Sequence, residues 1–155
     1  MGIRQANEND LDKIIELNQK LFDLEYDNFD QTTNCKWPIS ESARNFYLER
    51  ITGQKGCVFV AEEDGGIVGY LAGSIAEPSE YRNAGKVAEL DDMFVEEEYR
   101  NRQIGKKLMN AFLDWCKSAK VKRIKVLVTA LNKRGIDFYL ENCFKEMDVI
   151  LEREI

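Results

Sequence analysis

The chain has 155 residues, 44% of them hydrophobic, and a formal net charge of -6 from 28 acidic and 22 basic side chains. This length and composition predict one globular domain over residues 1–155, and the acidic balance argues against nucleic acid, which requires a basic face. The sequence has no histidine, and its four cysteines are widely spaced. We therefore expect no metal site and no Ser-His-Asp or Cys-His catalysis.

No apolar run approaches the roughly 20 residues that cross a bilayer, and no signal region follows Met1. We expect a cytoplasmic protein with no membrane partner. The first half of the chain predicts a strand at 2–6, a helix that Asn9 or Asp10 caps, an irregular segment at 24–37, and a helix from Ser40 to Gly53. Residues 57–61 and 67–75 read as paired strands around a tight Asp64-Gly65-Gly66 turn.

The second half predicts a loop at 78–86, a strand at 87–95 and a long helix with apolar residues at a period of 3.6 (Ile104, Leu108, Phe112, Trp115 and Ala119). A strand at 123–129 and a short helix at 132–141 follow, and 144–155 could hold one or two more strands. Hairpins followed by a β-α-β crossover predict an α/β fold, a mixed, largely antiparallel sheet with helices on both faces.

The segment between the strand at 87–95 and the long helix is the most informative part of the sequence. A polar, basic loop leads directly into the helix, whose first turn offers free backbone N–H groups and the positive end of the helix dipole. This arrangement is typical of a pyrophosphate site. It lacks the Gly-x-Gly-x-x-Gly pattern of dinucleotide folds.

The loop Arg100-Asn101-Arg102-Gln103-Ile104-Gly105 resembles the Arg/Gln-x-x-Gly-x-Gly/Ala loop of the GNAT family, the GCN5-related N-acetyltransferases, with Gln103 in place of the first glycine. The family's second block, Asn-x-x-Ala-x-x-x-Tyr followed by Gly-Phe, is similar to the set Asn132, Gly135, Tyr139, Cys143 and Phe144. The resemblance implies a sheet of 6–7 strands with two splayed central strands, acetyl-CoA as cosubstrate, and acetyl transfer to a primary amine.

The resemblance also implies which residues hold the cosubstrate. The main chain of Met93, Phe94 and Val95 would hold the pantetheine and thioester. The pyrophosphate would bind the amides of Arg100, Asn101, Arg102, Gln103, Ile104, Gly105 and Lys106. Asn132 and Tyr139 would contact the cosubstrate from the short helix.

An alkyl ammonium must lose its proton before it attacks a thioester, so the site needs a base. Strict alternation along the strand would place Glu89, Asp91 and Met93 on one face and Leu90, Asp92 and Phe94 on the other, a phase that a bulge would disturb. Glu89 matches the catalytic glutamate of histone-modifying members of the family, and Asp92 and Asp91 remain alternatives. Tyr139 is the candidate general acid for the leaving thiolate.

Acids and aromatic side chains in the segment 24–30 suit a cationic acceptor. We expect Glu25, Tyr26, Phe29 and Asp91 to bind a small amine of the polyamine or aminoglycoside kind, with the loop 78–86 as an opposite wall. A protein or peptide lysine or N-terminal acetyltransferase is the alternative, as is a non-catalytic acetyl-CoA-binding module. Leu127 stands where the N-terminal branch carries its glutamate, which counts against that mechanism. Dimers are frequent in the family, so the resemblance allows a homodimer, but the sequence does not fix the oligomeric state.

Overall fold

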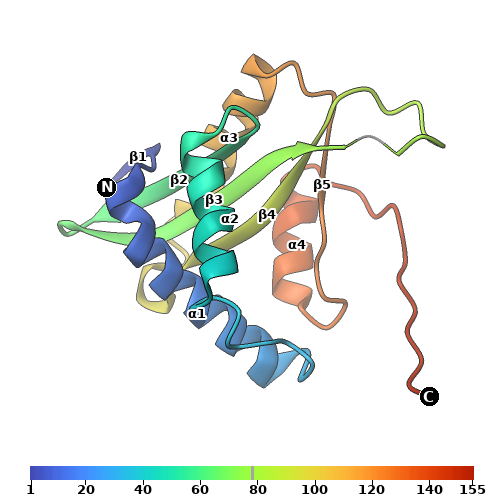
Figure 1. Cartoon of the computed structure of the whole chain (residues 1–155), viewed down its shortest axis with the longest axis horizontal. Helices are drawn as coiled ribbons and strands as arrows, with labels where there is room; N and C mark the ends of the chain where they lie inside the picture. Colours follow the sequence, from blue (N-terminus) through green and yellow to red (C-terminus); the bar gives the residue numbers. More distant parts are fainter. Residues whose placement is uncertain (78) are drawn as a thin grey trace.

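The computed structural model describes residues 1–77 and 79–155 and places five strands in one sheet in the order β1-β2-β3-β4-β5 (Figure 1). The strands are β1 (Gly2–Gln5), β2 (Gly56–Glu63), β3 (Gly66–Ala76), β4 (Val87–Val95) and β5 (Arg123–Val126). All neighbours pair antiparallel except β4 and β5, which run parallel. The helices are α1 (Leu11–Asn28), α2 (Glu41–Thr52), α3 (Ile104–Ser118) and α4 (Lys133–Glu141), with 3-10 turns η1 (Glu8–Asp10) and η2 (Glu97–Tyr99).

The sheet buries both of its faces. One face packs against α1 and α2 in a core that includes Ile14, Leu17 and Tyr47. The other packs against α3, whose Leu108, Met109 and Phe112 are fully buried. The 3.6-residue period of α3 and the alternation of the strands produce these two cores. The predicted mixed, largely antiparallel α/β sheet with helices on both faces is confirmed.

The two strands β4 and β5 pair over only part of their length. Their parallel ladder runs from Val87 opposite Arg123 to Leu90 opposite Val126, whereas β4 continues to Val95. Beyond Leu90 the outer edge of β4 has no strand beside it in the described chain. This is the predicted splay, and it leaves backbone N–H and C=O groups of β4 available for another hydrogen-bonding partner.

Local boundaries differ from the sequence prediction in the first helical region. Asn7 caps the turn η1, and its side chain accepts from the Asn9 N–H in a capping box with Asp10. Asp10, one of the two predicted residues, is the N-cap residue of α1, but its side chain makes no cap hydrogen bond to that helix. The helix α1 then continues through Asn28, so the prediction of an irregular segment from residue 24 is wrong. The helix persists because Leu21 and Leu24 continue its apolar stripe onto the core shared with α2.

The structure holds fewer strands than the predicted 6–7. The strand β5 ends at Val126 rather than residue 129, because β4 has already turned away from it. The strands predicted within 144–155 are absent from the described chain: residues 145–155 extend away from the sheet without a partner (Figure 1). Residue Pro78 of the predicted loop wall lies outside the described residues. No helix in the described ranges combines the length and apolarity that a membrane crossing requires.

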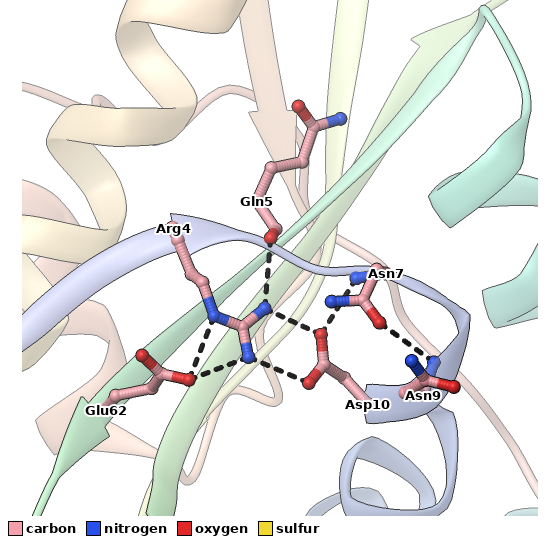
Figure 2. Close-up of polar contacts among 6 residues, drawn as sticks. All are labelled: Arg4, Gln5, Asn7, Asn9, Asp10 and Glu62. Carbon is pink, nitrogen blue, oxygen red and sulfur yellow. Dashed lines mark hydrogen bonds and ion pairs between the residues drawn. The ribbon is translucent and has the colours of Figure 1, made fainter.

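A partly buried set of ion pairs ties the start of the chain to the sheet (Figure 2). Arg4 of β1 donates to both carboxylate oxygens of Asp10, at 2.7 and 2.8 Å, and to Glu62 of β2 at 2.7 and 2.9 Å. Asp10 also accepts from the Asn7 N–H at 2.8 Å. The pKa of Asp10 lies below its usual value, chiefly through the hydrogen bonds from Arg4.

Candidate active site

A bulge in β4 decides which acids face the same side. Ala72 of β3 lies opposite Asp92 and Gly73 lies opposite Leu90, so Asp91 is the extra residue between them. An inserted residue reverses the alternation that follows it. Asp91 bonds to α2 and Ser74, and Asp92 bonds to Tyr47, so both acids face the side of α1 and α2. The expectation of opposite faces for them is therefore wrong.

Glu89 shares this face, because it pairs with Ser74 across the ladder and Ser74 donates to Asp91. The three carboxylates nevertheless have different partners. Glu89 forms an ion pair with Lys125 of β5 at 3.1 Å. Asp91 accepts from the Arg50 guanidinium of α2 at 2.6 Å, and both side chains are mostly buried.

Asp92 is the acid on this strand that forms no ion pair among the described residues, and the charge of Arg50 lowers its pKa only as a minor effect. Its oxygen Oδ2 accepts a hydrogen bond of 2.8 Å from the Tyr47 hydroxyl. Burial raises its pKa to about 6, against a smaller lowering effect of the Tyr47 hydrogen bond. Asp92 is thus a carboxylate that titrates close to neutral pH.

The hydroxyl groups behind Asp92 form a buried chain. Tyr47 Oη lies 3.4 Å from Tyr70 Oη, and Asn18 Nδ2 donates to Tyr70 Oη at 2.9 Å. Because Tyr47 donates its single proton to Asp92, the Tyr70 hydroxyl proton points to Tyr47. The chain therefore directs donors from α1 toward the carboxylate and fixes its orientation.

Tyr139 of α4 completes this group of titratable side chains. Its ring packs edge-on between Phe138 and Phe144, with ring centroids 5.4 Å apart in each pair. Burial raises its pKa, and the nearby charges of Asp92 and Glu25 raise it further. In the described chain its hydroxyl makes no hydrogen bond, so its proton is available to another group.

The loop that precedes α3 presents a row of unpaired amides. The first backbone bond into the helix runs from the Lys107 N–H to the Gln103 carbonyl at 3.1 Å. Within the described residues, the N–H groups of positions 101–106 have no backbone acceptor. Asn101 and Gln103 adopt positive φ, 63° and 61°, and so turn consecutive N–H groups outward.

The loop turns at Gln103, the position where the GNAT loop motif has its first glycine. Gln103 takes this left-handed conformation with a side chain that makes no cap bond. Gly105 follows in the first turn of α3, where a Cβ would lie 3.3 Å from the Phe138 ring of α4. The predicted segment 100–106 therefore forms an amide-lined turn that is packed against α4.

Two guanidinium groups stand beside this turn. Arg100 Nε donates to the Val95 carbonyl at 2.9 Å. The pKa of Arg100 is lowered by burial and by the charge of Arg134, which lies in the first turn of α4. Like charges held together favour an anion between them. Arg102 instead lies near Glu63 at 3.6 Å, and Lys106 is exposed.

The backbone of β4 supplies the second predicted contact surface. The Glu96 N–H donates to the Val68 carbonyl of β3 at 2.9 Å, and the Val95 carbonyl accepts from Arg100 on the opposite side. By alternation, Met93 and Val95 direct their peptide groups to the free edge of β4, whereas those of Phe94 face β3. The peptide groups of Met93 and Val95 therefore lie at the free edge of β4, whereas the side chain of Phe94 lies in the core with α1 and α2.

The end of α1 reaches the residues that follow β5. Glu25 accepts from Thr129 Oγ1 at 3.0 Å and from Asn132 Nδ2 at 3.4 Å. Asn132 also caps α4 by accepting from the Gly135 N–H at 2.9 Å. Tyr26 is exposed and Phe29 half-buried at the same end of the helix. The predicted acceptor residue Glu25 thus touches the predicted cosubstrate residue Asn132.

Sequence reasoning missed Tyr47, Arg50, Arg134 and Thr129. Tyr47 was visible only as part of the apolar stripe of α2, and the partner of its hydroxyl depends on the bulge in β4. Arg134 could have been noticed as a cation in the first turn of a helix that opens near the loop. No group of three metal-ligating side chains occurs in the part of the chain that the structure describes.

Comparison with known proteins identifies the family. Residues 18–143 match the model of the acetyltransferase (GNAT) family. An uncharacterized N-acetyltransferase of Methanocaldococcus jannaschii is 29% identical over 150 residues, which cover 96% of this chain and 62% of that protein. The chain thus spans less than two thirds of that relative's length. Because the family model matches most of the chain, the chain belongs to the GNAT acetyltransferase family.

Solved structures share the fold. The tetramutant of the BH1408 protein from Bacillus halodurans has a TM-score of 0.87 at 20% identity, with 100% of both chains covered. The aminoglycoside N-acetyltransferase AAC(6′)-Iy, solved with a CoA-S-monomethyl-acetylneamine bisubstrate analogue, has a TM-score of 0.77 at 22% identity, covering 99% of this chain and 97% of that one. At these identities the likeness shows a common fold.

Proposed function

We propose that this chain is an acetyl-CoA-dependent N-acetyltransferase that acetylates the primary amine of a small cationic substrate by direct attack, within one catalytic domain over residues 1–155. One observation carries the proposal. Asp92, a carboxylate without a cation partner, stands near the free phenol of Tyr139 where β4 leaves β5, in a chain of the GNAT family.

The chain offers groups that fit each part of coenzyme A. The free amides of residues 101–106 suit the pyrophosphate, since a helix N-terminus with outward N–H groups binds anions. Arg100 and Arg134 add positive charge at the same turn. The peptide groups of Met93 and Val95 suit the amides of the pantetheine arm, and Asn132 lies at the start of the neighbouring helix.

Asp92 is the proposed general base. Acetyl-CoA supplies the thioester, and the acceptor ammonium, with a pKa of about 10.4, must first give up a proton. A carboxylate of pKa about 6 accepts it at a free-energy cost about 3 kcal/mol lower than an ordinary aspartate. The amine nitrogen then bonds to the acyl carbon, the carbon–sulfur bond breaks, and the nitrogen releases its second proton to solvent as the amide forms. Glu89, the first sequence candidate, is held by Lys125 and is assigned to acceptor binding.

Tyr139 is the proposed general acid. Its raised pKa keeps the phenol protonated at neutral pH, so it can donate to the departing thiolate. In the described chain the Tyr139 hydroxyl makes no hydrogen bond to a protein group. The phenolate therefore regains its proton from solvent. The two groups stay in their working protonation states together, because Asp92 titrates far below Tyr139.

Charge supports a cationic acceptor. Glu25 and Asp92 lie without an ion-pair partner on the side where α1 and α2 meet the splayed strands, whereas Asp91 and Glu89 each form an ion pair, the latter at the more exposed position. Tyr26 and Phe29 provide aromatic faces near Glu25. AAC(6′)-Iy, which has the same fold, was solved with an aminoglycoside-derived analogue. An amine of the polyamine or aminoglycoside class therefore fits this site better than a neutral amine.

The test is a thiol-release assay with acetyl-CoA against polyamines, aminoglycosides, lysine peptides and peptides with free N-termini. We expect turnover with a polyamine or an aminoglycoside. In the Tyr139→Phe variant, kcat should fall about 100-fold with the fold intact. Turnover of the peptides alone would assign the protein-modifying alternative. CoA binding by calorimetry without turnover of any amine would assign the non-catalytic module, and no CoA binding would overturn both.

A further inference from the structure

Leu127 is a large apolar side chain that is 75% exposed and lies directly after β5. Two contacts show which face of the chain it belongs to. Lys125, two residues before it, meets Glu89 at 3.1 Å. Thr129, two residues after it, donates to Glu25 of α1 at 3.0 Å. Because side chains two residues apart in an extended chain share a face, Leu127 projects to the side of α1 and α2, where the carboxylates of β4 lie.

Leu127 lies where β4 and β5 part. The ladder between the two strands ends at Leu90 opposite Val126. The next residues are Asp91 and Asp92 on one side of the gap and Leu127 on the other. Single exposed leucines are common on protein surfaces, and the position beside the proposed base distinguishes this one. An amine that gives its proton to Asp92 has Leu127 beside the carbon atoms next to its nitrogen.

Glu25 supplies a second carboxylate farther along the same face. Its oxygens accept from Thr129 and Asn132, which are neutral donors, so it keeps its negative charge and further lone pairs. Burial, and after it the charges of Asp92 and Glu25, raise the pKa of Tyr139. The two carboxylates therefore flank the same phenol, and each can receive a cationic group of one acceptor.

The spacing of these groups indicates the length of the acceptor. Thr129, which holds Glu25, lies two residues beyond Leu127, or about 7 Å of extended chain. A saturated chain of four or five carbon atoms between two nitrogens has about this length. Its methylene groups would cover Leu127, whereas hydroxyl groups in the same place would lose water without gaining a hydrogen-bond partner. The apolar side chain therefore favours an aliphatic chain between the two charges.

On the basis of the proposed function, we infer that the acceptor is an aliphatic diamine and that Leu127 and Glu25 are its specificity-determining residues. The reacting amine lies at Asp92, the methylene chain lies against Leu127, and the second ammonium binds Glu25. A monoamine leaves Glu25 without a cation. An aminoglycoside brings enough charge but presents hydroxyl-bearing rings to Leu127.

The test compares kcat/KM for putrescine, cadaverine, butylamine and the aminoglycoside neamine in a thiol-release assay with acetyl-CoA. We expect the two diamines to exceed butylamine and neamine by about 10- to 100-fold. Leu127→Asn replaces the apolar contact with an amide of similar size. It should lower kcat/KM for the diamines about 10-fold, mainly by raising KM, and so narrow their lead over neamine. Glu25→Gln removes the charge and should bring the ratio of putrescine to butylamine close to one.

Leu151→Asn is the matched control, because it makes the same change at a leucine that is 90% exposed in the segment extending away from the sheet (Figure 1). It should keep the wild-type ratios. Leu127 is itself exposed, so its replacement leaves the fold intact, which circular dichroism checks.

The outcomes separate the diamine assignment from the proposed function. Neamine acetylated as well as putrescine, or a lead over neamine that survives Leu127→Asn, would overturn the assignment and leave the acetyltransferase in place. Butylamine used as well as putrescine by the wild type would overturn it equally, since Glu25 would then select nothing. The absence of thiol release with every amine would overturn the proposed function as well.

Discussion

The three carboxylates of β4 differ in their neighbours rather than in their chemistry. Lys125 and Arg50 neutralise Glu89 and Asp91, while Asp92 receives a hydrogen bond from the neutral phenol of Tyr47. Asp92 has no ion-pair partner, so burial outweighs the hydrogen bond from Tyr47 and the charge of Arg50 and raises the pKa of Asp92. A base that titrates near neutral pH is the consequence, and the bulge at Asp91 is its structural cause.

Asp92→Asn removes the proposed base and keeps an oxygen that accepts from Tyr47. We expect kcat to fall about 10²–10⁴-fold. In the wild type, kcat/KM should decline as the pH falls through about 6, because protonated Asp92 cannot accept a proton. Steady-state assays from pH 5 to pH 9 measure both effects. Glu89→Gln is the matched control and should lower kcat far less; the reverse order would return the role of base to Glu89.

The same substitution should stabilise the fold. The folded-state pKa of Asp92, about 6, lies above its ordinary value of 3.8, so folding disfavours the charged form. This penalty is absent below about pH 4, grows as the pH rises from about 4 to about 6, and levels off at about 3 kcal/mol above that. Asp92→Asn should therefore raise the free energy of unfolding at pH 8 and change it little at pH 4. Urea titrations at the two pH values test this, and equal effects would contradict the raised pKa.

Tyr47→Phe tests the hydrogen bond that holds Asp92. Its hydrogen bond lowers the Asp92 pKa, so its loss should move the acid limb of the activity profile to higher pH. Tyr70 also loses an acceptor, which costs about 1–2 kcal/mol of stability. Tyr70→Phe is the control, because it destabilises the same chain of hydroxyls without touching Asp92. A pH profile that stays in place in Tyr47→Phe would exclude the positioning role.

Motif spacing predicted the placement of several site residues but not the contacts among them. Asn132 was expected at the start of its helix and caps α4, because the capping side chain and the helix pattern are local in sequence. The bond between Tyr47 and Asp92 joins α2 to β4, and strict alternation would have turned Asp92 to the other face. A bulge depends on the pairing of two strands and leaves no mark in the sequence of either.

At the level of elements, the turn before α3 holds two residues, Asn101 and Gln103, in the left-handed region, and the strain falls mainly on Gln103 because asparagine tolerates that region better. Gln103 has φ 61° and ψ 14°, the left-handed region that disfavours a side chain by about 1–2 kcal/mol. Gln103→Gly removes this strain but also increases the conformational entropy of the unfolded chain, which offsets part of the gain. The net result should be a free energy of unfolding about 1 kcal/mol higher. Chemical denaturation measures the change.

The control for that variant is Gln103→Ala, which keeps the Cβ and the strain. CoA affinity, measured by calorimetry, should be unchanged in both variants, since the amides of the loop and not the side chain at 103 face the phosphates. Equal stability of the glycine and alanine variants would show that the turn is unstrained. A weaker affinity of both would show that the Gln103 side chain takes part in binding.

Elements with strong periodic patterns were predictable, and their ends were less so. The apolar residues of α3 recur every third or fourth position and give its register without tertiary information. The end of α1 depends on packing of Leu24 against the core, so the aromatic and acidic residues around it were read as a loop. The segment 145–155 has strand alternation but no strand beside it in its own chain, which local pattern alone does not reveal.

Across the whole molecule, the sheet joins the two halves of the sequence, and the ion pairs of Arg4 (the Arg4 clamp) fix the start of the chain to that sheet. The clamp joins β1 to the start of α1, which follows it closely in sequence, and to β2, which lies far from it in sequence (Figure 2). Asp10 is buried, with 7% of its surface exposed. If the guanidinium is removed, the Asp10 carboxylate stays buried without a compensating charge, which destabilises the folded state. Loss of the clamp should therefore lower the free energy of unfolding more than loss of an exposed ion pair does.

Arg4→Met should lower the free energy of unfolding at pH 7 by about 2 kcal/mol, less than for a fully enclosed pair because the Arg4 side chain is 36% exposed. Arg44→Met is the matched control: its pair with Asp12 is equally short at 2.8 Å but exposed, so the loss should stay below about 1 kcal/mol.

The folded-state pKa of Asp10 is lowered, so the clamp contributes above pH 4 and its contribution is lost as the pH falls through that lower value. Urea unfolding at pH 7 and pH 3 should therefore show the difference between wild type and Arg4→Met shrink in acid. Equal losses in the two variants at pH 7 would mean that the clamp acts as an ordinary surface pair.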